Sequence, residues 1–444
     1  MAPMATIRPF HGIRYNTNRI TDLSQVIAQP YDRINKAQQA AYYQQHANNF
    51  VRIDFGVTEP DAPGNNVYTR ARDYATEWLA DGVFQRDSQP AMYVLEQTFV
   101  TPDGQTHTRR AITAALQVTP FEEGIILPHE RTFSGPKTDR LNLTRATKAA
   151  WGHIFILYPD AENRINALLQ PALETTASLQ ARERVIEPAV AQRFWVLTDP
   201  DLLATIAREM APKRSLVIAD GHHRYETALN YRNEMRAEYP DAPADAAFNF
   251  ALATFVSMSD PGLVVLPTHR LVRDAANHSG AAVLTALAPY FEITSVVDRA
   301  ELAATLHAAS PDHPRFGFYA EHACAVLTLK SFDIMTELAP EHTPDWRALD
   351  VAVLHKLVLE HILGLAVGSG HDADSVTYLR DVNAAYAAVD NGEANYLFVL
   401  NPTRMPQVNA CTLAGEKMPQ KSTDFYPKMV GGLVSLALTG RMSD

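Results

Sequence analysis

The sequence predicts an α+β fold, and three observations support this prediction. Short apolar runs alternate with longer amphipathic runs along the 444 residues. The apolar runs 92–100 and 110–118 are separated by Thr-Pro-Asp-Gly-Gln, a sequence typical of a turn between paired strands. No repeat of fixed period and no low-complexity tract occurs in the sequence. Strands interleaved with helices and hairpins favour a mixed architecture over a purely parallel sheet.

The expected elements follow in chain order. The stretch 67–81 carries its apolar residues on one stripe and ends before Gly82, which predicts a helix. Asp199 is the predicted N-cap of another helix, and 225–238 and 349–365 are helical candidates. Buried or half-buried strands are expected at 92–100, 110–118, 153–158, 215–219, 248–258, 263–266 and 396–400.

The length of the chain is sufficient for roughly three domains, or for two large ones. The segment 236–247 is polar and contains prolines, which predicts a boundary between two domains. We therefore expect an N-terminal α+β region at 1–240 and a C-terminal α+β region at 241–444.

Composition and charge exclude several classes of protein. Hydrophobic residues make up 46% of the chain and charged residues 20%, which is ordinary globular usage. Lys and Arg number 39 against 50 Asp and Glu, and a net charge of −11 repels the phosphates of nucleic acids. The two cysteines cannot form a disulfide framework, and no signal sequence or bilayer-length apolar stretch occurs. We therefore expect a soluble cytoplasmic protein with neither nucleic acid nor membrane as a partner.

The sharpest local motif is an apolar strand that runs through Asp220 into Gly221, His222, His223 and Arg224. Glycine permits close approach of a ligand to the backbone, and the first amides of the following helix are hydrogen-bond donors. The imidazoles and the guanidinium add further donors for phosphate oxygens, which the helix dipole also favours. The alternative is an ordinary strand–helix turn in which Asp220 is only a helix cap.

Two further segments carry candidate chemistry. In 127–137, Glu130 follows His129 and is a candidate general base or metal ligand, and Lys137 on a Gly-Pro turn is a candidate anion ligand. In 417–428, three lysines and two hydroxyls resemble an anion cradle. A solvated loop is the alternative for the first segment, and a proline-stabilised turn is the alternative for the second.

Several standard motifs are missing from the sequence. It contains neither a P-loop nor a G-x-S-x-G elbow. The segment 368–373 imitates a dinucleotide-binding fingerprint, but the preceding stretch 349–365 is helical rather than a strand. His355 and His361 do not have the spacing of zinc-protease ligands.

Taken together, these motifs resemble those of the prokaryotic family labelled domain of unknown function 1015. The resemblance covers nearly the whole chain. It rests on the segments 7–15, 29–34, 128–137, 219–224 and 418–428.

The resemblance extends to the ParB/sulfiredoxin superfamily of nucleotide-binding domains, whose phosphate-contacting turn has the form Gly-x-x-Arg. It implies a ParB/sulfiredoxin-like core with large insertions, followed by a C-terminal α+β region. Free serine kinases carry an Asp-Gly-His-x-Arg turn and an upstream His-Glu pair with a catalytic glutamate. By this resemblance Glu130 and Asp220 are catalytic, and Gly221, His222, His223 and Arg224 bind the phosphates of a nucleotide. The long stretch between Glu130 and Asp220 departs from those compact kinases.

The leading hypothesis is a nucleotide-dependent phosphotransferase that acts on a small hydroxylated metabolite, with a free amino acid such as serine as one candidate. The resemblance implies ATP or ADP with Mg²⁺ as cofactors, and a homodimer is one expectation. The alternatives are a non-catalytic nucleotide or phosphate sensor and a metal hydrolase built on His129, His222 and His223. The metal ligands cannot be assigned from the sequence.

The remaining site residues are predicted to bind the substrate or an anion. They are His129, Lys137, Arg140, Lys421, Ser422 and Lys428. Clustered lysines in an acidic protein would attract a phosphorylated ligand to one cleft. We therefore expect one pocket to be lined by Glu130, Lys137, Arg224 and Lys421.

Overall fold

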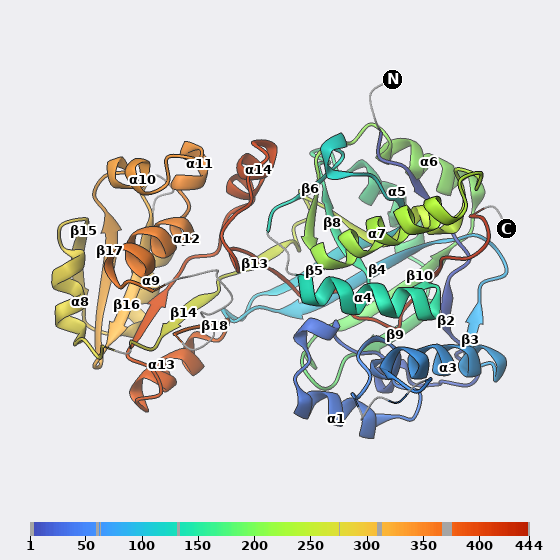
Figure 1. Ribbon diagram of the computed structural model, residues 1–444, viewed down its shortest axis with the longest axis horizontal. Coiled ribbons are helices and arrows are strands. Elements are labelled where there is room, and N and C mark those ends of the chain that lie inside the picture. Colours follow the sequence, from blue (N-terminus) through green and yellow to red (C-terminus); the bar gives the residue numbers. More distant parts are fainter. Residues whose placement is uncertain are drawn as a thin grey trace. The chain divides into compact units, whose positions relative to one another are not determined.

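In the computed structural model the chain divides into two units. Unit 1 comprises Met1–Pro128, Thr132–Val264 and Pro427–Asp444, and unit 2 comprises His129–Arg131 and Val265–Tyr426. The structure describes residues 4–58, 62, 64–130, 134–274, 276–308, 313–365 and 375–442. Figure 1 labels many of the elements of both units.

Unit 1 is built on a nine-stranded mixed sheet. Along its main path the strand order is β6-β11-β8-β12-β5-β4-β10-β9, and β1 pairs with β5. The β11–β6 and β12–β8 pairs are parallel, and the other pairs are antiparallel. The strands are β1 (Ile7–Arg8), β4 (Met92–Val100), β5 (Thr106–Gln117), β6 (Ile126–Pro128), β8 (Ile154–Tyr158), β9 (Leu179–Arg182), β10 (Ala191–Leu197), β11 (Leu216–Asp220) and β12 (Phe250–Ser257).

The central strands of this sheet are buried on both faces. Every residue of β8 and of β12 is buried, as expected for strands covered by helices on both sides. Their apolar side chains form one core with those of β4, β5 and β11. Gly104, in the turn between β4 and β5, has a φ of 82°, a value that favours glycine.

The helices of unit 1 begin at recognisable caps. Asn66 and Thr69 form a capping box at the start of α3, and the Asp199 side chain accepts from the amide of Asp201 at the start of α6. The longer helices are α1 (Lys36–Gln45), α3 (Val67–Ala80), α4 (Ser134–Thr147), α5 (Arg164–Leu173), α6 (Pro200–Met210) and α7 (His222–Glu238). The shorter elements are β2 (Ile13–Tyr15), η1 (Leu23–Gln25), η2 (Tyr31–Arg33), α2 (Val51–Asp54), β3 (Phe84–Arg86), η3 (Phe121–Glu123), β7 (Ala149–Ala150), η4 (Ala247–Asn249) and β21 (Leu436–Ala437).

Unit 2 has a six-stranded antiparallel sheet of order β15-β17-β16-β19-β14-β18. A separate apolar core lies between this sheet and two of the helices, α9 and α13. The strands are β14 (His269–Val272), β15 (Phe291–Val296), β16 (Arg315–Ala320), β17 (Ala323–Leu329), β18 (Val376–Leu379) and β19 (Tyr396–Val399). The helices are α8 (Gly280–Leu287), α9 (Arg299–His307), α10 (Asp333–Leu338), α11 (Pro344–Arg347), α12 (Asp350–Val353), the π-helix η5 (Leu354–Ile362), α13 (Val382–Asp390) and α14 (Met405–Leu413). The short strands β13 (Val264–Leu266) and β20 (Asp424–Tyr426) lie next to the unit boundaries.

The structure confirms a mixed α/β architecture with a large mixed sheet. A ParB/sulfiredoxin-like core stays a prediction. The unit boundaries differ from the single boundary predicted after residue 240, because β12 follows that point and pairs with β5 and β8 of the same sheet. The polar segment 236–247 therefore connects α7 to β12 within unit 1.

The expected helix 349–365 is present as α12 and η5. The fingerprint-like segment 368–373 lies outside the described residues. Among the helices that the structure describes, none has the length and apolar character needed to cross a bilayer.

Candidate functional site

The predicted phosphate-binding turn connects β11 to α7 in unit 1. Gly221 is the N-cap of α7 and has a φ of 90° and a ψ of 29°, in the left-handed region. A Cβ atom at this position would lie 3.0 Å from Nε of Arg224. A Cβ atom at Gly152 would likewise lie 3.1 Å from Cδ of the same arginine. Two glycines therefore leave the space that the Arg224 side chain occupies.

Asp220 ends β11 and joins two cations. Its Oδ1 accepts a hydrogen bond from Nζ of Lys428 at 3.2 Å, and its Oδ2 accepts one from Arg224. Arg224 also donates to the carbonyl oxygen of His153. Burial alone would raise the pKa of Asp220, but Lys428 and Arg224 together hold it well below its usual value. Asp220 is therefore an ionised ion-pair partner and not a helix cap.

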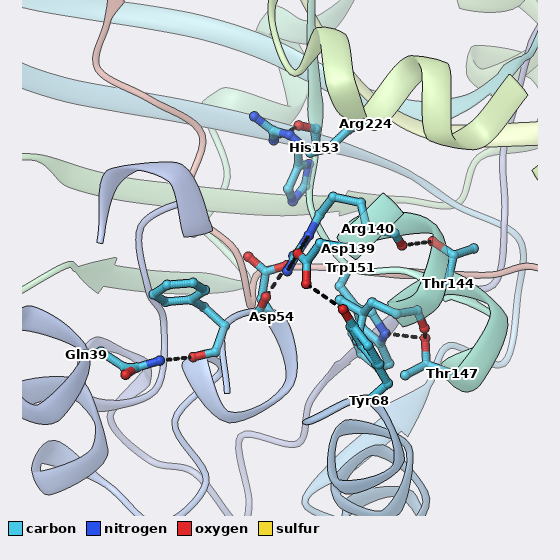
Figure 2. A network of polar contacts seen from close by, with 12 residues as sticks. Gln39, Asp54, Tyr68, Asp139, Arg140, Thr144, Thr147, Trp151, His153 and Arg224 are labelled. Atoms are coloured by element: carbon cyan, nitrogen blue, oxygen red, sulfur yellow. Dashed lines mark hydrogen bonds and ion pairs between the residues drawn. The ribbon is translucent and has the colours of Figure 1, made fainter. Parts of the chain in front are cut away.

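Arg140 is buried among acidic groups. Its NH1 donates to Oδ1 of Asp54 at 2.9 Å and its NH2 donates to Oδ2 of Asp139 at 2.6 Å (Figure 2). Its guanidinium lies 4.0 Å from the centroid of the Tyr31 ring. Because both nitrogen ends of the guanidinium already bind carboxylates, these contacts give Arg140 a role in positioning α4 and α2.

His153 lies beside Arg224 and carries a neutral imidazole (Figure 2). Its Nδ1 is 2.8 Å from Oγ1 of Thr254. Burial, and then the charge of Arg224, lowers the pKa of His153 to about 3. Its buried Nε2 has no hydrogen-bond partner among the residues that the structure describes.

The other predicted residues of unit 1 lie at the start of α4 and in the first turn of α7. Nζ of Lys137 is 2.8 Å from Oε2 of Glu226. His222 is buried, and His223 is half-buried, which lowers its pKa. A cavity of about 50 Å³, enough for a few water molecules, lies beside Arg224, Arg140, Asp54 and Thr227.

His129, Glu130, Lys421 and Ser422 belong to unit 2. Nε2 of His129, a fully buried residue, is 2.7 Å from Oγ1 of Thr423 and 3.8 Å from Oε1 of Glu130. The Glu130 side chain is 22% exposed, so it remains accessible to a substrate. Lys421 is exposed at a φ of 57°, and Ser422 is buried.

The twelve predicted residues therefore divide between the units. Unit 1 contains Lys137, Arg140, Asp220, Gly221, His222, His223, Arg224 and Lys428. A single pocket containing Glu130, Lys137, Arg224 and Lys421 stays a prediction. No group of three or more His, Cys, Asp or Glu side chains within the described ranges is placed to hold a metal ion.

Sequence reasoning missed several residues that contact Arg140 or Arg224. They are Tyr31, Asp54, Gly152 and His153. Tyr31 stands in one of the motifs that carry the family resemblance, and a polar residue at the start of the apolar run 153–158 is a weak signal for His153. No sequence signal distinguishes Asp54 from a surface acid, because its role depends on the fold that brings α2 to α4.

Comparisons with known proteins give a family and several weak structural likenesses. Residues 7–352 match the family model described as "Protein of unknown function (DUF1015)". A search of curated proteins gave no match.

Three solved structures illustrate the structural likeness. A conserved hypothetical protein from Pyrococcus furiosus has 13% identity and a TM-score of 0.31, with 72% of this chain and 93% of that chain covered. A free serine kinase in complex with AMP has 11% identity and a TM-score of 0.31, covering 68% and 86%. SbnI with a C-terminal truncation, from Staphylococcus aureus, has 10% identity and a TM-score of 0.34, covering 74% and 88%.

Proposed function

The chain belongs to the DUF1015 family, and we propose that it is a nucleotide-dependent phosphotransferase that acts on a small hydroxylated metabolite. The observation that carries this proposal is the meeting of Lys428 and Arg224 at Asp220, beside the N-terminus of α7. A free amino acid such as serine is the candidate acceptor, and ATP or ADP is the candidate donor.

Three features of unit 1 support phosphate binding there. The N-cap of α7 is Gly221, and its lack of a side chain lets the Arg224 guanidinium lie at the start of the helix. The positive end of the helix dipole attracts anions. Lys428 and Arg224 supply two positive charges, and both form ion pairs with Asp220. A phosphate oxygen would replace one oxygen of Asp220 and form a charge-assisted hydrogen bond of the same kind.

Glu130 is the proposed general base. In the proposed reaction, the hydroxyl oxygen of the acceptor attacks the terminal phosphorus of the nucleotide. The bond from that phosphorus to the bridging oxygen breaks, which leaves ADP from ATP or AMP from ADP, and Glu130 takes the hydroxyl proton. Positive charge on Arg224 and Lys428 would stabilise the charge that develops on the phosphates.

The described residues provide no ligand set for a resident metal, so a divalent ion would belong to the nucleotide substrate. The same finding gives no support to the metal-hydrolase alternative. The proposal therefore derives no step from a metal held by the protein.

Calorimetric titration with ATP and ADP, each with and without MgCl₂, tests the phosphate site. We expect Arg224→Ala to weaken nucleotide binding by about 1.5–3 kcal/mol, because a charge-assisted hydrogen bond is lost. Arg232→Ala, on the same helix, is the matched control and should bind as the wild type does. Equal affinities of wild type and Arg224→Ala, with both proteins folded by circular dichroism, would remove the Gly221 turn as the nucleotide site.

A further inference from the structure

A cavity of about 200 Å³ lies within unit 2, and Ser422 is the one predicted site residue that lines it. Three arginines line it: Arg270 from β14, Arg315 from the first position of β16, and Arg404 from the N-cap of α14. Asp350, the first residue of α12, is the one acidic side chain among the described lining residues. The cavity therefore has a positive lining in a chain whose net charge is −11.

Arg270 is 1% exposed and binds no carboxylate among the described residues. Its NH2 donates to the carbonyl oxygens of Gln420 and Lys421 at 3.2 and 3.1 Å, and its Nε donates to Nε2 of His355 at 3.1 Å. Its hydrogen bonds are made to neutral groups, and Glu130 acts on its charge electrostatically without forming an ion pair with it. A buried charge without an ion pair is costly, and an anion bound nearby would reduce that cost.

Arg315 also has no ion pair within the described part of the chain, and its Nε donates to Oγ1 of Thr328 at 3.1 Å. The charge of Arg404 acts on Asp350, the acidic side chain among the described lining residues. Burial raises the pKa of Asp350 to about 7, so this carboxyl neutralises only part of the positive charge at neutral pH.

The lining also has an apolar part, made by Leu306, Val351, Leu400 and Pro402. Cationic groups beside apolar side chains are typical of sites that hold a small molecule by one charged end. The arginine fork matches the two oxygens of a carboxylate or a phosphate.

We propose that this cavity is a second ligand site, which binds small organic anions through Arg315 and Arg404 and places their carbon atoms against the apolar wall. The ligand carries a carboxylate or a phosphate on a short carbon chain. The cavity is distinct from the group formed by Asp220, Arg224 and Lys428, because all of the residues that line it belong to unit 2.

Titration of the full chain with butyrate and with ethyl phosphate, in a buffer of low ionic strength, tests the proposal. We expect one of the two compounds to bind. Binding of butyrate would indicate a carboxylate ligand, and binding of ethyl phosphate would indicate a phosphate ligand. Arg315→Gln should weaken that binding at least 10-fold. Arg273→Gln, which removes an exposed arginine from the same unit, should change it less than twofold.

A second measurement does not depend on a variant. In the wild type, the bound ligand should protect Arg315 and Arg404, but not Arg273, from phenylglyoxal in a mass-spectrometric assay. Absence of binding of both compounds at 10 mM, or equal affinity of wild type and Arg315→Gln without protection, would overturn the proposal. Repeating the titration with the Arg224→Ala variant tests whether the two sites are separate. This variant should lose nucleotide affinity but bind the organic anion as the wild type does.

Discussion

At the scale of single residues, the ion pairs that each charged group of unit 1 forms determine whether it is available to bind a ligand. Both oxygens of Asp220 bind cations, and both nitrogen ends of the Arg140 guanidinium bind carboxylates. Arg140 would have to break its buried ion pair with Asp54 or its partly exposed pair with Asp139 to bind a ligand, which makes it a poor anion ligand. Lys428 and Arg224 both bind Asp220, and the carboxylates of Asp32 and Asp54 also act on the charge of Arg224. A phosphate would therefore compete with carboxylates for these two cations.

Glu130→Gln separates a kinase from a sensor. If Glu130 is the base, nucleotide affinity should persist while turnover falls by about 10²–10⁴-fold, the usual contribution of general-base catalysis. Coupled measurement of nucleotide consumption with serine and other hydroxylated acceptors gives the rate. Glu337→Gln, an exposed substitution of the same kind in α10, is the control. A chain that binds nucleotide but turns over no acceptor, with or without Glu130, would be a sensor.

Asp350 links the stability of the chain to pH. Burial raises its folded-state pKa from 3.8 to about 7, so the folded protein holds a proton that the unfolded chain has released between these pH values. Stability is therefore lost as the pH rises from about 4 to 7. The charged and titratable groups that line the same cavity are Arg270, His307, His313, Arg315 and Arg404.

Asp350→Asn should remove this dependence, because the amide cannot ionise. We expect the variant to gain about 2–4 kcal/mol over the wild type at pH 8 and almost nothing at pH 4. Urea unfolding at the two pH values measures the difference. A gain of the same size at both pH values would show that packing, and not ionisation, causes it.

At the scale of elements, the β11–α7 turn depends on a glycine for two reasons, which a pair of variants separates. Gly221→Ala places a side chain at a φ of 90° and 3.0 Å from Nε of Arg224. Gly82→Ala places one at a φ of 70° with nothing within 4 Å, so it reports the backbone cost alone. We expect about 1–2 kcal/mol of destabilisation for Gly82→Ala and more for Gly221→Ala.

Chemical denaturation gives both free energies of unfolding, and calorimetry gives the nucleotide affinity. The affinity should fall for Gly221→Ala alone, because only this substitution displaces Arg224. Equal destabilisation of the two variants with unchanged affinity would contradict a role of the glycine in positioning the arginine.

For the π-helix η5 of unit 2, the apolar pattern predicted a helix but not its π-helical hydrogen bonding. The stretch 349–365 has an amphipathic pattern that predicts a helix, and the structure has one with i→i+5 hydrogen bonds, as between the Leu363 amide and the Val358 carbonyl. The wider turn carries His355, which accepts from Nε of Arg270. Periodicity cannot distinguish an α-helix from a π-helix over so few turns, because the apolar positions almost coincide.

At the scale of the whole molecule, charge governs the choice of partner. A net charge of −11 gives no attraction to a polyphosphate backbone, and the cations near Asp220 are partly neutralised. We expect no shift of duplex DNA in an electrophoretic assay at 150 mM salt and micromolar protein. A shift that weakens steeply with added salt would show a basic surface and contradict this expectation.

The sequence by itself determined part of the local structure of this protein. The strand 92–100, the helix 67–81 and the cap at Asp199 are found within one residue of their predicted positions. It also determined the Gly221 turn, because strand, glycine and helix signals are contiguous there. Apolar periodicity and capping depend on near neighbours in the chain, and a sequence displays those directly.

Tertiary structure alone decided which distant groups meet. Lys428 reaches Asp220 across 208 positions, Arg140 reaches Asp54 across 86, and β12 returns to the sheet of unit 1 after the predicted boundary. These contacts depend on which strands pair with one another. The strands have similar apolar patterns, so the sequence alone does not show which of them pair. Local patterns therefore identify Asp220, Arg224, Arg140 and Lys428 as candidates, but the path of the chain decides which of them neutralise one another.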